Sequence, residues 1–333
     1  MTSSRISIRH LSKRARALVG SKPKALVESV HEQSKDRVMI EIGVVSNLSA
    51  PHLLAAEHQL TRLLKTAADP IPFRLRSFSL SSTKSSAAAD YCGDINDLFR
   101  ENLDGLIVTG AEPRAPSLPE ESYWQMLTEI ADWAEVNTRS TIWSCLAAHA
   151  AVLYLDGIER RRLEKKCSGV FTCFKMLDNK LTRGLASLLK VSHSRLHGLS
   201  ETDVREAGYQ VLTESKVAGV DIFVKNRRSQ FIFFQGHPEY DPWSLQREYL
   251  RDLDRYLAGR QDTYPSPPEE YFENATVVAL EAFRTMVLDK RNPALIAHLP
   301  KLTLQKGIMT EPAIAAAIIF RNWIEYLVES KAG

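Results

Sequence analysis

The chain has 333 residues, of which 44% are hydrophobic and 25% charged, and its formal net charge is +3 at pH 7. This composition is typical of a globular protein, and the length allows one large α/β domain with a small accessory segment. The sequence has no stripe of basic residues, so nucleic acid is excluded as an expected partner. No apolar run approaches the roughly 20 residues that span a bilayer. The four cysteines lack CxxC spacing, which predicts reduced thiols in a cytoplasm and no metal site.

The first 35 residues form a basic leader. Residues 1–27 contain no acidic side chain, whereas seven are Lys or Arg and serines are frequent. This is the composition of an organelle transit peptide. The alternative is the leader of a bacterial enzyme, packed on the body of the protein or on a partner subunit.

Alternating strands and helices are expected after the leader. The run Arg37–Val45 predicts a buried strand, and Pro51 opens a helix with one apolar face. Further expected elements are a strand at Phe73–Leu80, a short helix at Asp97–Asn102, a strand at Gly105–Thr109, a proline-rich loop at Gly110–Pro119 and a helix at Glu120–Asn137. This order predicts an α/β fold with a doubly wound, mostly parallel sheet of the flavodoxin-like kind, in which sites form at the carboxyl ends of strands.

The second half of the chain has a different pattern. β-rich runs at 219–225 and 229–234 predict a hairpin, and Trp243–Leu257 predicts an amphipathic helix. Prolines at 265–268 break the chain, and the helices expected beyond them carry no chemical motif. We therefore divide the chain into a leader at 1–35, an α/β domain at 36–262 and a helical C-terminal extension at 263–333 that packs on that domain or on a partner subunit.

Two strand ends carry the residues of a cysteine nucleophile. Thr141-Ile142-Trp143-Ser144-Cys145 followed by a helical run predicts a strand, a tight turn with the thiol, and a helix. The helix N-terminus favours the thiolate, and nearby backbone N–H groups can hold an oxyanion. About ninety residues later, a second strand runs into Gly236-His237-Pro238-Glu239, which supplies a base and an orienting carboxylate.

Simpler interpretations exist for each residue. A cysteine at the end of an apolar strand is more often a small buried hydrophobic residue than a nucleophile, and a loop histidine is usually structural. The two strand-end contexts favour a Cys145, His237 and Glu239 site, because open α/β sheets place their sites there.

Seven collinear blocks identify a family resemblance. They are Asp104-Gly105-Leu106-Ile107-Val108-Thr109-Gly110-Ala111, Tyr123-Trp124, Cys145, Lys166-Cys167-Ser168-Gly169-Val170, His193-Ser194-Arg195, Gly236-His237-Pro238-Glu239-Tyr240-Asp241 and Arg251-Asp252. In this order they resemble the homoserine O-acyltransferases of methionine biosynthesis, usually called homoserine O-succinyltransferases, whose fold resembles class I glutamine amidotransferases. The resemblance covers roughly residues 36 to 260. A weaker match occurs at Asn322-Trp323.

The resemblance implies ping-pong acyl transfer. Cys145 would take a succinyl or acetyl group from CoA, with His237 as base and Glu239 orienting it, and pass that group to the hydroxyl of homoserine. Acyl-CoA is then a co-substrate, and no cofactor or metal is implied. Carried over by position, Arg251 matches the arginine that holds the amino acid carboxylate, and Lys166 and Ser194 match substrate-pocket positions.

The chain also departs from the family. Where the family has a Met-Pro-Lys-Lys segment beside the oxyanion site, this chain has residues 47–52, so oxyanion stabilisation falls to the backbone N–H of Leu146 or to His52. At the position that influences the acyl group, the family has Gly for succinyl or Glu for acetyl, and this chain has Arg114. A guanidinium there can pair with the free carboxylate of a succinyl group, or it can pair with Glu112 or water.

Other functions remain open at this stage. The same scaffold can acylate serine or another hydroxy amino acid in place of homoserine. A glutamine-hydrolysing amidotransferase would use the same three residues, but Ser144-Cys145-Leu146-Ala147 replaces its usual Gly-x-Cys-x-Gly. A catalytically silent relative is a third possibility, which the retention of all three residue types argues against. We expect a cytoplasmic homodimer that binds acyl-CoA and a hydroxy amino acid.

Overall fold

The computed structural model describes residues 26–29, 38–46, 50–80, 92–110, 113–288 and 290–332. In this part of the chain, eleven strands form one sheet in the order β1-β3-β2-β5-β6-β11-β10-β9-β7-β8, with β4 paired to β3. The strands are β1 (Leu26–Ser29), β2 (Ile40–Ser46), β3 (Phe73–Ser79), β4 (Gly93–Asp94), β5 (Gly105–Val108), β6 (Ser140–Ser144), β7 (Arg161–Lys175), β8 (Leu188–Gly198), β9 (Gln210–Ser215), β10 (Gly219–Asn226) and β11 (Gln230–Phe234).

The centre of the sheet is parallel. Strands β3, β2, β5, β6 and β11 pair side by side in the same direction, and every residue of β5 and β6 is buried. Strands covered on both faces need near-continuous hydrophobic runs, and β5 and β11 show them most clearly, with the sequences Gly-Leu-Ile-Val and Gln-Phe-Ile-Phe-Phe. The predicted doubly wound α/β fold is thus confirmed.

An antiparallel extension continues the sheet beyond β11. Strands β10 and β11 form the predicted hairpin, and β9, β7 and β8 follow in antiparallel pairs. The pair β7 and β8 is the longest in the described chain, with 15 and 11 residues. The sequence analysis predicted no such long ribbon, because polar residues interrupt both segments.

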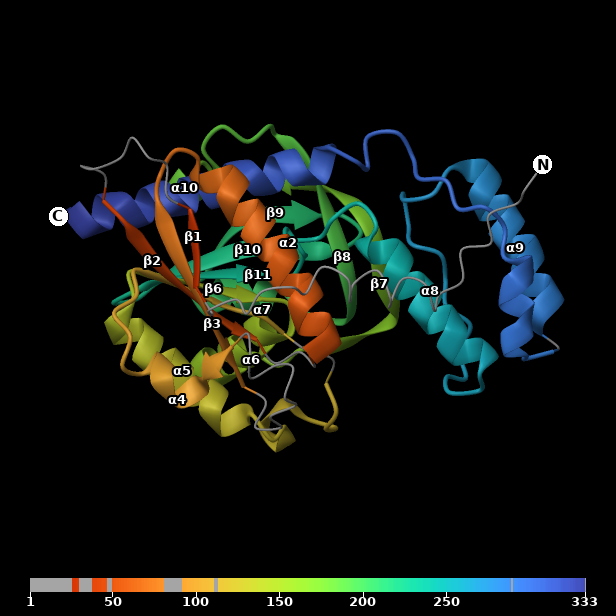
Figure 1. The fold of residues 1–333 in the computed structure, drawn as a ribbon, viewed down its shortest axis with the longest axis horizontal. Coiled ribbons are helices and arrows are strands. Elements are labelled where there is room, and N and C mark those ends of the chain that lie inside the picture. Colours follow the sequence, from red (N-terminus) through yellow and green to blue (C-terminus); the bar gives the residue numbers. More distant parts are fainter. Residues whose placement is uncertain are drawn as a thin grey trace.

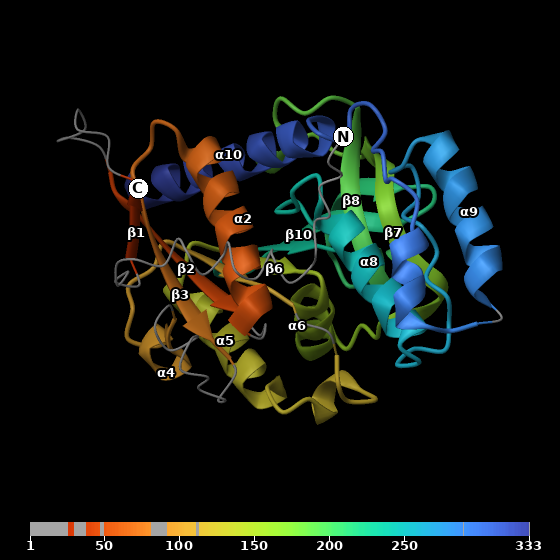
Figure 2. The same ribbon diagram turned by 45° about the vertical axis from the view of Figure 1, so that its right-hand side comes forward.

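Helices cover both faces of the sheet. Figures 1 and 2 show α2 (Ala50–Ala68) and α10 (Glu311–Ala332) crossing one face, whereas α4 (Ile95–Leu98), α5 (Trp124–Asn137) and α6 (Leu146–Asp156) lie on the other. Each face has its own hydrophobic core, with Phe320, Trp323 and Ile324 of α10 in the first and Trp143 in the second. The C-terminal helix therefore belongs to the core of the α/β domain. Among the described residues, no helix combines the length and apolar character needed to cross a membrane.

A smaller layer lies beyond β7. It contains α8 (Ser244–Leu257), α9 (Asn274–Leu288) and the 3₁₀ turn η3 (Pro293–His298), which Figures 1 and 2 show at the end of the molecule farthest from β1. Tyr249 of α8 packs with Tyr271, Phe272 and Leu280 in a separate cluster. Three short elements complete the described structure: α7 (Glu201–Glu206), η1 (Leu118–Glu120) and η2 (Lys180–Thr182).

The expected element boundaries hold within a few residues. The strand expected at Arg37–Val45 is β2, and the helix expected from Glu120 begins at Trp124 because η1 precedes it. The described part of the leader, residues 26–29, is strand β1, which pairs antiparallel with β3. The remainder of the expected leader lies outside the described residues.

Candidate active site

The backbone at Cys145 is strained. This residue joins β6 to α6 with φ 53° and ψ −116°, a left-handed conformation that is rare for a residue with a Cβ. Its N–H donates to the carbonyl oxygen of Phe234 at 2.7 Å, which ties the turn to the end of β11. The side chain is half-buried at the N-terminus of α6, as a nucleophile requires.

The sheet register brings the histidine to the cysteine. Ser144 pairs with Phe234 in the parallel ladder of β6 and β11, so the residues that follow both strands meet at one edge. The N–H of His237 donates to the carbonyl oxygen of Ser192 at 2.8 Å, and the side chain of Cys145 lies close enough to the imidazole to act on its pKa. Nδ1 of the same ring lies 2.8 Å from Oε1 of Glu239. The structure thus brings Cys145, His237 and Glu239 together as predicted from the sequence.

The charges of this triad favour an ion pair. Burial lowers the pKa of His237, but the charges and hydrogen bonds of Cys145 and Glu239 outweigh burial and place that pKa well above its ordinary value. The ring of Tyr240 stacks on the imidazole at 4.2 Å between centroids, which fixes its plane. A protonated imidazole beside the cysteine is the arrangement that supports a cysteine nucleophile.

An oxyanion position lies beside the thiol. Leu146 is the first residue of α6, so its N–H lies in the turn whose N–H groups have no partner within the helix. The backbone of Gly110, at the end of β5, approaches it so closely that a Cβ on Gly110 would lie 2.7 Å from the Leu146 nitrogen. This arrangement supports the expected use of the Leu146 N–H. The side chain of His52 lies outside the described residues.

Three of the four expected substrate residues belong to one network on β7, β8 and α8. Lys166 Nζ lies 2.8 Å from Asp252 Oδ2 and 3.7 Å from Glu248 Oε2. Arg251 contacts Asp252 Oδ1 through Nε at 3.0 Å and Nη2 at 2.9 Å. Ser194 donates a hydrogen bond to Glu248. Both carboxylates thus have cationic or hydroxyl partners, and the network has groups for both ends of an amino acid.

Glu248 is the residue that the sequence analysis missed. Its second oxygen accepts a hydrogen bond from the hydroxyl of Tyr240, the same residue that stacks on His237. Glu248 therefore links the network on α8 to the catalytic base. The available signal was its spacing, since Glu248 precedes Asp252 by one helical turn on the same face.

Arg114 lies apart from this network. Its backbone N–H and that of Ala115 donate to Oε1 of Glu121 at 2.6 and 2.9 Å, which shapes the loop after β5. Its side chain is exposed, and its charge lowers the pKa of Tyr123, which burial raises overall. The expected alternative partner Glu112 lies outside the described residues. Arg114 is thus on the loop beside the nucleophile.

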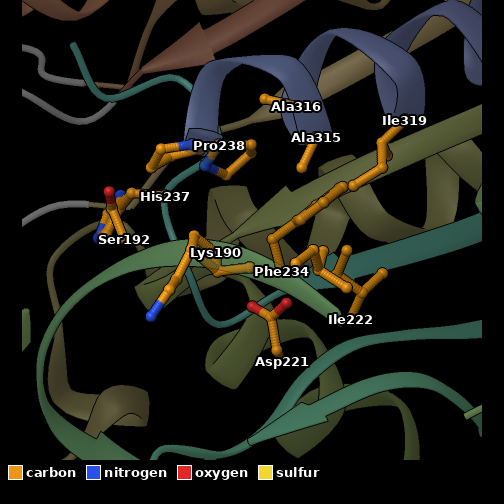
Figure 3. Close-up of a pocket in the computed structure, with 13 residues that line it drawn as sticks. Lys190, Ser192, Asp221, Ile222, Phe234, His237, Pro238, Ala315, Ala316 and Ile319 are labelled. Atoms are coloured by element: carbon orange, nitrogen blue, oxygen red, sulfur yellow. The ribbon is translucent and has the colours of Figure 1, made fainter. Parts of the chain in front are cut away.

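The C-terminal helix supports the base from below. Figure 3 shows a small pocket under the loop at His237 and Pro238, closed by Ala315, Ala316 and Ile319 of α10. Helix α10 carries no chemical motif, yet its small residues allow this close approach to the end of β11.

Buried polar side chains hold the same loop from the sheet. Asp221 on β10 accepts hydrogen bonds from the hydroxyl of Thr213 at 2.8 Å and from the N–H of Gly236 at 3.3 Å. Burial raises the pKa of Asp221 to about 6. Cys173 and His193 lie against it, with the ligand atoms of all three within 4.8 Å, but both Asp221 oxygens already accept hydrogen bonds. We therefore interpret this cluster as support for the residue before His237.

The fold and the site define a class of protein. A cysteine at a strained turn, with a histidine and a glutamate after the neighbouring strand of a doubly wound sheet, is an arrangement suited to enzymes that use a cysteine nucleophile. In fold, the chain is similar to a glutamine amidotransferase from Thermotoga maritima, with TM-score 0.46 and 13% identity over 87% of this chain and 98% of that one. A glutamine amido transferase from Methylobacillus flagellatus gives TM-score 0.45 and 15% identity over 87% and 96%.

Sequence comparison identifies the family within this class. The family model for homoserine O-succinyltransferase matches residues 7–333. A homoserine O-succinyltransferase from Bradyrhizobium japonicum is 49% identical over 303 residues, covering 89% of this chain and 93% of its own length. One from Rhodopseudomonas palustris is 50% identical over 303 residues, covering 88% and 91%. The chain belongs to the homoserine O-succinyltransferase family and is an acyltransferase.

Proposed function

We propose that this acyltransferase moves a succinyl group from succinyl-CoA to the side-chain hydroxyl of homoserine through an acyl-enzyme on Cys145. The observation that carries the proposal is the meeting of Cys145, His237 and Glu239 at one edge of the sheet, where His237 is hydrogen-bonded to Glu239 and its pKa lies well above its ordinary value. The names of the relatives support the acyl group and the acceptor.

The first half-reaction forms the acyl-enzyme. The Cys145 thiolate attacks the thioester carbonyl of the donor, and the Leu146 N–H donates to the resulting oxyanion. The carbon–sulfur bond to CoA then breaks, and His237 gives its proton to the departing thiolate. Because one thioester replaces another, neither direction of this step is strongly favoured.

The second half-reaction transfers the group to the acceptor. Acylation removes the negative charge of Cys145, which is the largest of the influences that raise the pKa of His237. The imidazole is then neutral and can take the proton of the acceptor hydroxyl. The alkoxide attacks the acyl group, and Cys145 departs as a thiolate beside the imidazolium. The triad is thereby restored.

The network on α8 supplies the acceptor subsite. We propose that Arg251 binds the carboxylate of the amino acid, because a planar guanidinium forms two parallel bonds to a carboxylate. Glu248 would then receive its ammonium group, with Ser194 and Lys166 orienting Glu248. Serine, which is one methylene shorter than homoserine, is the alternative acceptor. Acetyl-CoA is the alternative donor, and Arg114 is a second candidate contact for a succinyl donor.

Intact-protein mass spectrometry tests the proposal. After incubation with succinyl-CoA, the wild type should gain the mass of one succinyl group, and homoserine should remove it. Cys145→Ala should gain none, and His237→Ala should form the adduct several orders of magnitude more slowly. An adduct formed only from glutamine would favour the amidotransferase, and no adduct from succinyl-CoA, acetyl-CoA or glutamine would favour a silent relative.

We also propose a cytoplasmic homodimer. Free Cys92, Cys145, Cys167 and Cys173 are compatible with a reducing compartment. Helix α9 leaves Val278 and Met286 exposed at 71% and 45%, which offers apolar surface for a second copy. Light scattering on the purified protein tests the dimer, and a monomeric mass at micromolar concentration would contradict it.

A further inference from the structure

His149 is a buried histidine on the nucleophile helix, and it takes no part in the proposed chemistry. It lies one helical turn after Cys145, and its backbone N–H donates to the carbonyl oxygen of Cys145 at 3.2 Å. Its side chain is only 2% exposed. A polar ring in such a place is costly unless a hydrogen bond engages it. The partner of the ring therefore decides what this side chain contributes.

Gln235 is that partner, and it lies two residues before the base. Oε1 of Gln235 is 2.9 Å from Nε2 of His149. Successive residues of an extended chain point to opposite faces of a sheet, so Phe234 contacts Phe320 of α10 on one face and Gln235 points toward α6 on the other. The bond therefore joins the helix of the nucleophile to the segment that carries the base.

The imidazole is the donor in this bond. Nε2 of Gln235 donates to the carbonyl oxygen of Val220 at 2.6 Å, and its Oε1 accepts the N–H of Leu199 at 3.1 Å. These contacts fix the orientation of the amide, so His149 faces an oxygen that can only accept. Burial lowers the pKa of His149 to about 3, so the ring is neutral and carries its one proton on Nε2.

Two hydrogen bonds thus join the turn of the nucleophile to the segment of the base. The first is between main chains, from the N–H of Cys145 to the carbonyl oxygen of Phe234 at 2.7 Å. The second is the bond from His149 to Gln235, one turn into the helix. One bond alone would let the two segments rotate about it, whereas two bonds fix their relative orientation. A buried polar pair whose partners are all in place holds one such arrangement.

We propose that His149 is a positioning residue that, through Gln235, holds the reacting pair at its working distance. This pair is Cys145 and His237, and the inference rests on the proposed acyl transfer through Cys145. A shift of about 1 Å at a reacting pair can cost about a hundredfold in rate. The bond therefore acts on the rate of acylation and has little effect on binding of the donor.

The test compares two substitutions of His149. His149→Leu removes the donor and keeps much of the volume, whereas His149→Gln keeps an N–H donor at the end of the side chain. Rapid mixing with succinyl-CoA, followed by mass spectrometry, gives the rate of acyl-enzyme formation. His149→Leu should lower the maximal rate by about ten- to a hundredfold, with the half-saturating concentration of succinyl-CoA within about twofold of that of the wild type. His149→Gln should regain most of the rate.

Val152→Ala is the control for lost packing. It removes buried apolar volume one turn further along the same helix, so it destabilises α6 without removing a hydrogen bond. Its acylation rate should stay within about twofold of that of the wild type. An equal loss of rate in this variant would assign the effect of His149→Leu to stability and overturn the inference.

The pH dependence of alkylation separates positioning from stability. Iodoacetamide reacts with the thiolate, and peptide mapping distinguishes Cys145 from the other cysteines. A protonated His237 held beside the thiol stabilises the thiolate, so alkylation should become fast at a lower pH in the wild type than in His149→Leu. Val152→Ala should keep the wild-type profile, because loss of packing alone leaves the reacting pair in place.

The outcomes distinguish the inference from the function on which it rests. A wild type that forms no acyl-enzyme overturns the proposed function, whereas the alkylation profiles still test the positioning because they need no donor. A His149→Leu variant that keeps its acylation rate and its profile overturns the inference alone, as do equal losses in His149→Leu and His149→Gln. If His149→Leu does not fold, nitrogen NMR of the wild type decides. His149 should carry its single proton on Nε2 between about pH 5 and pH 8, and a proton on Nδ1 would overturn the inference.

Discussion

A Cβ placed on Gly110 would lie 2.7 Å from both the backbone nitrogen and the Cβ of Leu146. The contact exists because β5 and β6 are neighbours in the parallel sheet, so that the segments after their carboxyl ends meet. The N–H that the mechanism assigns to the oxyanion is thus held in place by a glycine from a different strand. Glycine is required here because of space, not because of its backbone angles.

Gly110→Ala is expected to lower kcat by about ten- to a hundredfold, with a smaller change in KM for the donor. The added methyl group must displace the Leu146 N–H, and oxyanion donors act only at their exact distance from the developing charge. Steady-state kinetics measure the effect. Gly93→Ala is the control, because the nearest atom to its Cβ would be 3.4 Å away. Unchanged kcat in Gly110→Ala would remove Leu146 from the mechanism.

Glu239→Gln is expected to lower the pKa of His237. The carboxylate is one of the groups that raise this pKa, so its loss favours the neutral imidazole. The imidazolium exists below the His237 pKa and is lost as the pH rises through it, so in the variant the thiolate–imidazolium pair is lost at lower pH. NMR titration of the imidazole follows the shift. Glu206→Gln, an exposed change on α7, should leave the curve in place, and an unshifted curve in Glu239→Gln would contradict the orienting role.

Arg251→Lys is expected to raise KM for homoserine by about ten- to a hundredfold. An ammonium makes a point contact where the guanidinium makes two bonds to a carboxylate. Formation of the acyl-enzyme from succinyl-CoA should keep its wild-type rate, since the acceptor has no part in that step. Arg260→Lys, which changes a largely exposed arginine paired with Asp254, serves as control. A slower acylation step in Arg251→Lys would place this arginine in the donor site.

Trp323→Ala is expected to destabilise the protein by about 3–5 kcal/mol, the usual cost of removing a large buried aromatic side chain. The indole is fully buried on the face of the sheet and donates to the hydroxyl of Ser140 at 3.0 Å. It also fills the space above Gly105, whose Cβ would lie 2.7 Å from it. Chemical denaturation measures the loss. Val217→Ala, at an exposed position in the turn between β9 and β10, should change stability by less than about 0.5 kcal/mol.

The residues of the candidate site could be predicted from the sequence because they lie just after the ends of strands. Cys145 comes directly after β6 and His237 comes three residues after the end of β11, and parallel strands place such positions at one edge. Glu239 could be predicted as the partner of His237 because it lies only two residues after it in the chain. The long β7 and β8 ribbon was not predicted, since its polar positions break the alternating pattern that marks a strand.

Contacts between segments far apart in the chain had weaker signals in the sequence. In the sequence, Glu248 looks like an ordinary charged residue on an exposed helix face. The structure shows that Tyr240 and Ser194 donate hydrogen bonds to it.

The sequence by itself determined the α/β class, the order of the strands and helices from Arg37 to Cys145 and the family, and it predicted the three residues of the proposed triad. Local patterns suffice for these, because hydrophobic periodicity and strand-end motifs act over a few residues. Only the tertiary structure decided that α10 lines the same pocket as His237 and that Gly110 approaches the Leu146 N–H. Each of these depends on packing between segments far apart in the chain, which side-chain volume and sheet register establish and which no local pattern encodes.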